Sequence, residues 1–227
     1  MNLKNKVVFI TGSSIGIGRA IAFEFAKEGS KLIITYRSSK TEVEKVVKKC
    51  RELGSPDVLL LKLDVSDNDS IKNSVEEVKK YFGKIDILVN NAGYLVWVPL
   101  SKQTFEEIEK CIRTNLEGLI KMTLVCLPLV QSLIINIASK TGTIAEIDAT
   151  TYGATKWGVR GFTKALALEL PSEIKTYAVN PAGTATQMND FAGTPPEEVG
   201  KIIVNLAKGK YNLPSGSDVN VWEYTNL

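Results

Sequence analysis

The stretch KVVFITGSSIGIGRAIAFEFAKEG, residues 6–29, places an apolar run, a glycine-rich turn and a helical segment one after another. Residues 6–11 are apolar and rich in β-branched side chains, which is typical of a buried strand. Residues 18–29 have apolar side chains at helical spacing, and Gly29 stands where a glycine C-cap is expected. The stretch therefore predicts a strand that leads through a tight turn into a helix.

The same alternation of apolar runs and amphipathic segments continues along the chain. Further strands are predicted at residues 31–36, 57–65, 85–93, 132–139, 173–181 and 217–224, and helices at 39–54, from Ser66 or Asp67 to 83, and at 101–127, 151–170 and 195–209. Continuous apolar strands separated by helices indicate a parallel sheet covered on both faces. We expect one doubly wound α/β Rossmann domain over residues 1–227, with about seven strands and its ligand at their carboxyl ends.

The composition excludes several classes of partner and site. A net charge of +3, from scattered basic residues, gives no reason to expect a nucleic-acid or membrane partner. The amino-terminal residues show no signal-peptide pattern, and no apolar run reaches membrane-spanning length. Cys50, Cys111 and Cys126 are odd in number and unpatterned, which indicates reduced thiols and a cytoplasmic location.

The chain contains no histidine. This excludes Ser-His and Cys-His nucleophilic chemistry and any His-ligated metal site, and we expect no metal. Acid–base chemistry near neutral pH would need a retuned carboxyl, lysine or tyrosine side chain.

The turn TGSSIGIG, residues 11–18, carries three glycines between the first strand and the first helix. Gly12 permits a tight turn, Gly16 lets the backbone approach a pyrophosphate, and Gly18 lets the helix pack closely on the sheet. The helix N-terminus then presents free N–H groups to the phosphates. The alternative is a glycine-rich turn that binds nothing.

The end of the second strand reads TYRSSK and has no acidic residue before Glu42. A carboxylate there would suit the ribose 2′-hydroxyl of NAD, whereas Arg37 and Ser38 suit a 2′-phosphate. The alternative is that Arg37 lies in solvent on a surface turn.

Three further polar residues follow strands or lie on a helix. Ser139 ends the fifth strand, thirteen residues before Tyr152, and would otherwise simply cap a turn. Tyr152 and Lys156 stand one helical turn apart, either as an acid and its activator or as two surface residues. The same spacing at Tyr36 and Lys40 spans a strand end and a turn, so no catalytic role is expected there.

The segments TGSSIGIG, NNAG (90–93), RTNLEG (113–118), INIAS (135–139), YGATK (152–156) and NPAGTATQM (180–188) occur in the order and spacing of the short-chain dehydrogenase/reductase family, which the chain resembles over residues 6 to about 188. The resemblance is strongest to members similar to 3-oxoacyl-carrier-protein reductases and sugar dehydrogenases. It implies catalytic roles for Asn115, Ser139, Tyr152 and Lys156.

With the residues above, the resemblance implies an NADP(H) site preferred over NAD(H), formed by Gly12, Ser14, Gly16, Ile17, Gly18, Arg37, Ser38, Asp64, Val65, Asn91, Ala92, Gly93, Tyr152, Lys156, Pro181, Thr184 and Thr186. The family also commonly pairs subunits through its long central helices, which implies a homo-oligomer through residues 101–127 and 151–170.

The chain departs from the family pattern in four places. Ala182 stands where the family has glycine after proline, and the lid segment 184–195 is short. The passage between the Asn115 helix and the fifth strand is also short, and the usual Asp-Gly-Gly near the carboxyl terminus is absent. These departures affect the lid, the substrate pocket and the oligomer interface. Tyr94, Trp97 and Met188 are candidates to line the pocket, although core packing would explain them equally well.

The expected reaction is NADP(H)-dependent interconversion of a carbonyl and a secondary alcohol, with a small-molecule substrate. Tyr152 would be the acid/base, its pKa lowered by Lys156 and the oxidised cofactor, and Ser139 would hold the substrate oxygen. The alternative is a catalytically idle NADPH-binding sensor or assembly protein.

Overall fold

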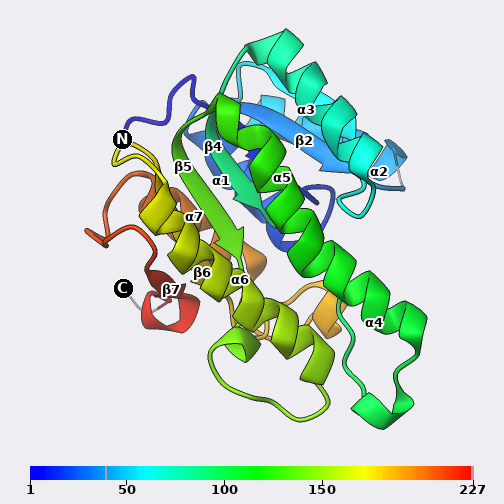
Figure 1. Ribbon diagram of the computed structural model, residues 1–227. Coiled ribbons are helices and arrows are strands. Elements are labelled where there is room, and N and C mark those ends of the chain that lie inside the picture. The colour runs from blue at the N-terminus through cyan, green and yellow to red at the C-terminus, as the bar shows by residue number, and fades with distance from the viewer. Residues whose placement is uncertain (39, 226–227) are drawn as a thin grey trace.

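A computed structural model of the protein describes residues 1–38 and 40–225 and has one parallel sheet at its centre (Figure 1). Its seven strands follow the order β3-β2-β1-β4-β5-β6-β7. The strands are β1 Val7–Ile10, β2 Lys31–Tyr36, β3 Val58–Lys62, β4 Ile85–Asn90, β5 Val130–Ile137, β6 Lys175–Asn180 and β7 Asp218–Asn220. The predicted doubly wound α/β fold is confirmed.

Helices cover both faces of the sheet (Figure 1). One face carries α1 Gly16–Lys27, α2 Lys40–Glu52 and α7 Pro196–Ala207, and the other carries α3 Asn68–Phe82, α4 Phe105–Ile112, α5 Gly118–Cys126 and α6 Thr150–Glu169. Because successive side chains of a strand point to opposite faces, β1 contributes Val8 and Ile10 to one core and Phe9 to the other. Both faces are buried, which explains why the strands are apolar throughout.

The predicted long helix 101–127 is divided in the structure. Thr104 caps α4 with a capping box to Glu107, so the helix begins at Phe105 and a separate turn, Leu100–Lys102, precedes it. A π-helical turn, Arg113–Glu117, then joins α4 to α5. Apolar residues keep helical spacing across both interruptions, so the spacing alone predicts one continuous helix.

Several other predicted boundaries are wrong by a few residues. The helix after the first strand begins at Gly16 and not at Gly18, and β7 spans only Asp218–Asn220 before a short 3₁₀ turn. Asp67 caps α3 by accepting from the Ser70 N–H, whereas Ser66 hydrogen-bonds Asp64. Ser39, at the start of the second predicted helix, and residues 226–227 lie outside the described residues.

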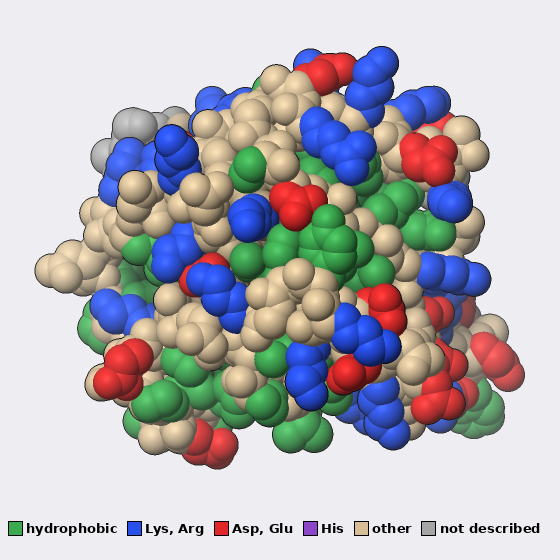
Figure 2. Space-filling view, turned by 90° about the horizontal axis from the view of Figure 1, so that it is seen from above, with side chains coloured by type: hydrophobic (Ala, Val, Ile, Leu, Met, Phe, Trp, Pro, Cys, Tyr) green, Lys and Arg blue, Asp and Glu red, His purple; other side chains and the backbone are tan. Residues whose placement is uncertain are grey.

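The described surface is mixed in charge. Figure 2 shows the end of the molecule at which β4 and β5 begin, with Lys/Arg and Asp/Glu side chains interspersed. Cys50, Cys111 and Cys126 are free and buried. Among residues 1–38 and 40–225, no helix has the length and apolar content needed to cross a membrane, and no cluster of His, Cys, Asp and Glu side chains is suited to a metal ion.

Candidate active site

A cleft of about 790 Å³ lies at the carboxyl ends of the strands. With the exception of Asn115, every residue predicted for the site lines it. The cleft thus brings the glycine turn, the end of β2 and the polar residues of β5 and α6 into one cavity.

The glycine turn has the geometry expected of a phosphate cradle. Gly12 and Gly16 have φ angles of +64° and +55°, which favour glycine. A Cβ on Gly18 would lie 2.3 Å from the Gly12 carbonyl oxygen, so only glycine fits this helix-to-turn contact. No side chain caps the N-terminus of α1, so its first N–H groups remain available for an anion.

A hydrogen-bonded frame holds this turn. Thr35 Oγ1 accepts from the Gly12 N–H at 2.9 Å. Asn91 Nδ2 donates to the carbonyl oxygens of Thr11 and Gly12, and Thr11 Oγ1 accepts from the N–H groups of Asn91 and Ala92. The Asn91 side chain therefore braces the cradle from the end of β4. In the sequence, the feature that indicates this frame is a threonine at the end of each of two adjacent strands, Thr11 and Thr35.

The end of β2 forms the rim of the cleft. Arg37 and Ser38 are exposed there and line the cavity together with Asp64 and Val65. Burial acts to raise the pKa of the Asp64 carboxyl, but hydrogen bonds from Ser66 and the charges of Arg37 and Lys110 hold that pKa below its ordinary value. Asp64 is thus an anion within electrostatic reach of Arg37.

Tyr152 and Lys156 lie on α6 and face the cleft. Lys156 is only 4% exposed, and its Nζ donates to the Ile137 carbonyl oxygen at 2.9 Å and lies 5.5 Å from the centre of the Tyr152 ring. Burial lowers the pKa of Lys156 to about 8. The ammonium is therefore held between the end of β5 and the phenol.

The protein's own groups do not lower the pKa of the Tyr152 phenol, contrary to the sequence-based expectation. Burial disfavours the phenolate and raises the pKa of Tyr152 to about 12, although the neighbouring Ser139 acts in the opposite direction. The charges of Cys111 and Glu146 add to the increase. Tyr152 is consequently a proton-bearing acid in this environment.

Ser139 serves as a cap as well as a cleft residue. It follows β5 and caps the 3₁₀ turn η4, Lys140–Gly142, by accepting from the Thr141 N–H. Its Oγ lies 2.6 Å from Thr141 Oγ1. The capping interpretation of this serine is confirmed, and the residue also lines the cleft.

Asn115 does not line the cleft. Its side-chain amide hydrogen-bonds the backbone of Tyr94, a residue that does line it. Its Oδ1 accepts from the Tyr94 N–H at 2.7 Å and its Nδ2 donates to the Tyr94 carbonyl oxygen at 2.8 Å. The residue lies in the π-turn between α4 and α5, a distortion frequently found at functional sites. Its side chain fixes the loop that carries Tyr94.

Part of the cleft wall is formed by aromatic and other large apolar side chains. Tyr94, Trp97 and Met188 line it, and the Trp97 and Tyr152 ring centres are 6.4 Å apart. Glu146, which the sequence analysis did not single out, lines the same cleft. The short lid is tied at its base, where the Thr194 N–H donates to the Gly183 carbonyl oxygen and the Ala185 N–H to that of Thr194.

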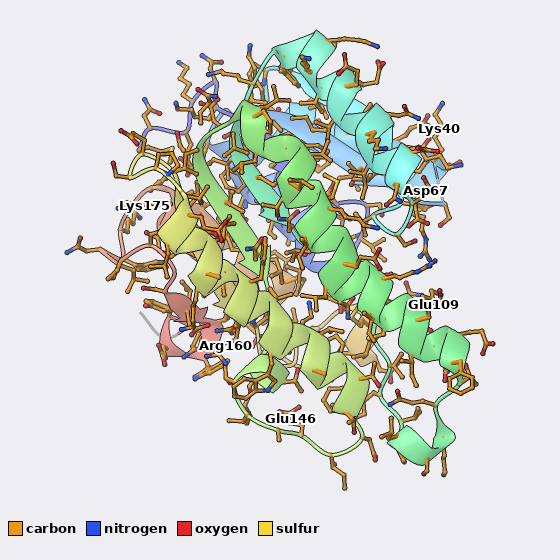
Figure 3. All side chains as sticks on the ribbon, in the orientation of Figure 1. Lys40, Asp67, Glu109, Glu146, Arg160 and Lys175 are labelled. Carbon is orange, nitrogen blue, oxygen red and sulfur yellow. The ribbon has the colours of Figure 1, made fainter. Side chains whose placement is uncertain are left out.

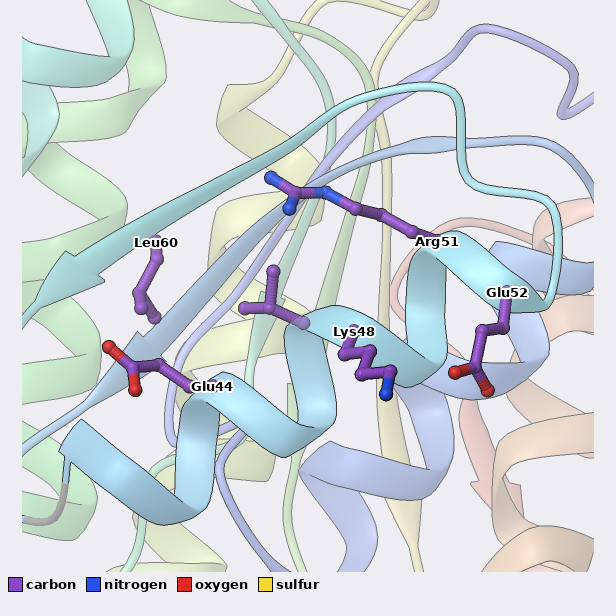
Figure 4. Close-up of a pocket in the computed structure, with 6 residues that line it drawn as sticks. Glu44, Lys48, Arg51, Glu52 and Leu60 are labelled. Carbon is purple, nitrogen blue, oxygen red and sulfur yellow. The ribbon is translucent and has the colours of Figure 1, made fainter.

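A second, smaller hollow of about 340 Å³ lies between α2 and β3 (Figure 4). Acidic and basic side chains alternate around it, including Glu44, Lys48 and Arg51. None of the predicted site residues lines this hollow, so it is separate from the cleft described above.

The geometry agrees with comparisons to known proteins. The family model for short chain dehydrogenases matches residues 6–196. The chain is 37% identical over 190 residues to the 3-oxoacyl-[acyl-carrier-protein] reductase FabG of Staphylococcus aureus, covering 82% of this chain and 77% of that protein. It is 33% identical over 243 residues to the FabG of Thermotoga maritima, covering 97% and 98%.

A solved structure extends this agreement to the fold. The short chain dehydrogenase of Burkholderia cenocepacia in complex with NADP superposes with a TM-score of 0.90 at 26% identity, covering 100% of each chain. Sequence and fold both match this family, in agreement with the strand order and the glycine cradle. They also agree with the cluster of Ser139, Tyr152 and Lys156. The chain belongs to the short-chain dehydrogenase/reductase family of oxidoreductases.

Proposed function

We propose that the protein interconverts a carbonyl and a secondary alcohol with NADP(H), using Tyr152 as the acid/base. The observation that carries this proposal is that Ser139, Tyr152 and Lys156 line the same cleft as the glycine cradle. A dinucleotide that extends from the cradle along this cleft would bring its nicotinamide end to these three side chains. This arrangement supports hydride transfer next to a proton donor.

The residues present fit such a cofactor. The pyrophosphate would lie on the uncapped N-terminus of α1, against Gly16 and next to Gly18, where a Cβ has no room. Arg37 and Ser38 would hold the 2′-phosphate, and Asp64 and Val65 would flank the adenine. The inner part of the cofactor would contact Asn91, Ala92, Gly93, Pro181, Thr184 and Thr186.

The protein's own groups would perform the proton chemistry. NADPH, when bound, supplies the hydride to the carbonyl carbon. Tyr152 gives its phenolic proton to the carbonyl oxygen as that oxygen becomes an alkoxide, and solvent returns a proton to the phenolate. The Lys156 ammonium stabilises the phenolate, and the Ser139 hydroxyl donates to the substrate oxygen. In the oxidation direction the same groups act in reverse.

The raised pKa of Tyr152 keeps the phenol protonated at neutral pH, which suits proton donation to a carbonyl oxygen. The relatives named as 3-oxoacyl-carrier-protein reductases support the same direction for this chain. The free, buried thiols support a reducing compartment such as the cytoplasm.

We also propose that the protein is a homo-oligomer through α4, α5 and α6. These helices expose large apolar side chains to solvent, namely Ile112, Ile120, Leu124, Trp157 and Leu168. A second copy of the same surface would bury them. Light scattering at micromolar protein should give a multiple of 24.9 kDa, and a monomeric mass would refute the proposal.

Consumption of NADPH with a panel of ketones and β-ketoesters tests the enzymatic proposal. Turnover of any member, abolished by substitution of Tyr152, is the expected result. Tight NADPH binding without turnover across the panel would instead favour an idle nucleotide-binding protein, an alternative to which the short lid lends support.

A further inference from the structure

Glu146 is a charged residue of the cleft to which the proposed reaction assigns no role. It lies on the loop that leads from η4 to α6, as Figure 3 shows, and it is half-buried. It lines the cavity together with Tyr152 and Trp97. It therefore shares the cavity with the phenol that the proposed reaction uses.

The Glu146 carboxylate has no hydrogen-bond or ion-pair partner among residues 1–38 and 40–225. The ammonium of Lys156, the nearest cation on α6 to Tyr152, is instead bound to the Ile137 carbonyl oxygen. A partly desolvated carboxylate is stabilised when it accepts a hydrogen bond. The cleft thus offers an acceptor whose natural partner is a donor group on a bound molecule.

The carboxylate is also close to the reacting position. Of the titratable groups that act on Tyr152, Cys111 comes from α4 and Glu146 from the loop, and the Glu146 charge raises the pKa of the phenol. Glu146 and Tyr152 line the same cavity, so the carboxylate and the hydroxyl that would protonate the substrate oxygen face one space. A substrate that occupies the cavity beside Tyr152 would therefore also meet Glu146.

Aromatic surface lies in the same cleft. Trp97 is 44% exposed, and its ring is tilted by 47° against that of Tyr152. An indole face attracts a cation or packs against the carbon atoms of a hydroxylated compound. An aromatic wall and an acceptor carboxylate together suit a small polar substrate with a donor group.

We infer that Glu146 determines substrate choice in the proposed reaction: it accepts a hydrogen bond from a hydroxyl or ammonium group beside the reacting carbonyl and disfavours a carboxylate there. This inference rests on the proposed function, since it assumes that the carbonyl binds at Tyr152. It predicts that the protein reduces hydroxy- or amino-substituted ketones in preference to keto acids.

Four methyl ketones that differ only in the group beyond the carbonyl test the inference. These are hydroxyacetone, dimethylaminoacetone, butanone and pyruvate, whose reduction by NADPH is compared by kcat/KM. The wild type should favour hydroxyacetone and dimethylaminoacetone over butanone by roughly tenfold, and butanone over pyruvate. Glu146→Ala should abolish both preferences for donor groups and raise pyruvate reduction.

Glu146→Gln separates the two donor classes. The amide oxygen still accepts from a hydroxyl, so the preference for hydroxyacetone should be partly retained, whereas the preference for the cationic ketone should be lost. Asp148→Asn is the matched control, because Asp148 lies on the same loop but does not line the cleft, and its φ of +63° suits asparagine. It should behave as the wild type does with all four ketones.

A titration checks the placement of Glu146 without turnover. The phenolate absorbance of Tyr152, obtained as wild type minus Tyr152→Phe, should appear at lower pH in Glu146→Gln but not in Asp148→Asn. Identical titrations in both variants would overturn the placement.

The outcomes distinguish the two proposals. Ketone or β-ketoester reduction with the same preferences in wild type and Glu146→Ala would overturn the inference alone. A wild-type preference for pyruvate would also overturn it and would point to Lys140, which lines the cleft one residue after Ser139. No reduction of any ketone or β-ketoester would overturn the proposed function, and the inference with it.

Discussion

The Nζ of Lys156 lies 5.5 Å from the centre of the Tyr152 ring and is anchored at 2.9 Å to the carbonyl oxygen of Ile137. The anchor comes from β5, so the sheet holds the ammonium and α6 presents the phenol. Burial shifts the two pKa values toward neutral forms, to about 8 for Lys156 and about 12 for Tyr152. The pair therefore begins as a protonated phenol beside a readily titrated ammonium.

Tyr152→Phe should abolish turnover and leave NADPH binding within about twofold of the wild type, because only the proton donor is lost while the glycine cradle is intact. Removal of an acid/base group typically costs about 10²–10⁴-fold in rate. NADPH fluorescence titration and steady-state kinetics measure the two effects. A correctly folded variant that retains more than a few per cent of kcat would contradict the assignment.

Reduction should weaken as the pH rises through about 8. Burial lowers the pKa of Lys156 to about 8, so the ammonium that stabilises the phenolate is present below that pH and lost above it. The phenol, with its pKa near 12, stays protonated throughout. The measurement is kcat for a reduced ketone between neutral and alkaline pH.

Lys156→Arg provides the control for this profile. A guanidinium keeps its charge to pH values above about 12, so the variant should be slower but flat over the same range. An unchanged alkaline decline in Lys156→Arg would assign the decline to another group.

The wild type should prefer NADPH to NADH by about tenfold or more in kcat/KM. A charge-assisted hydrogen bond from Arg37 to the 2′-phosphate is worth about 1.5–3 kcal/mol. Arg37→Asp should lose or invert the preference, and added salt should weaken it in the wild type because Arg37 is exposed. Equal use of both nucleotides by the wild type would show that Arg37 lies in solvent.

Asp218→Asn should destabilise the protein at neutral pH but not in strong acid. Burial acts to raise the pKa of Asp218, but hydrogen bonds from Arg160, Lys164 and Asn180 outweigh it and lower the pKa to about 2. A carboxyl with a lowered pKa contributes stability above its ordinary pKa of 3.8 and loses it as the pH falls toward 2. The contribution is roughly 2 kcal/mol at neutral pH.

Urea unfolding at several pH values measures this contribution. The difference between Asp218→Asn and wild type should shrink as the pH falls from about 4 toward 2. Glu198→Gln is the control, because its pair with Lys201 is exposed and should matter little at any pH. A pH-independent difference for Asp218→Asn would mean that packing, not charge, is lost.

Much of the candidate site could be predicted because its residues lie at the ends of periodic elements. Apolar strand runs and helical spacing are local properties, and the carboxyl ends of parallel strands meet at one edge of a sheet. The sequence therefore predicts that Gly12, Arg37 and Ser139 lie in one cleft, and the structure confirms it. The π-turn at Asn115 and the hydrogen bond that Asn115 accepts from the Tyr94 N–H could not be predicted, because that bond joins segments far apart in the sequence.

The sequence by itself determined the doubly wound fold, the glycine cradle and the chemical groups available for catalysis in a chain without histidine. Only the tertiary structure decided the direction of the Tyr152 pKa, the presence of Glu146 in the cleft and the bond between Arg160 and Asp218. Residue types and their spacing are written along the chain, whereas burial and electrostatic contact depend on which distant segments pack together. For that reason the proposed catalytic groups could be identified from the sequence, whereas their proton affinities and the place of Glu146 in the cleft could not.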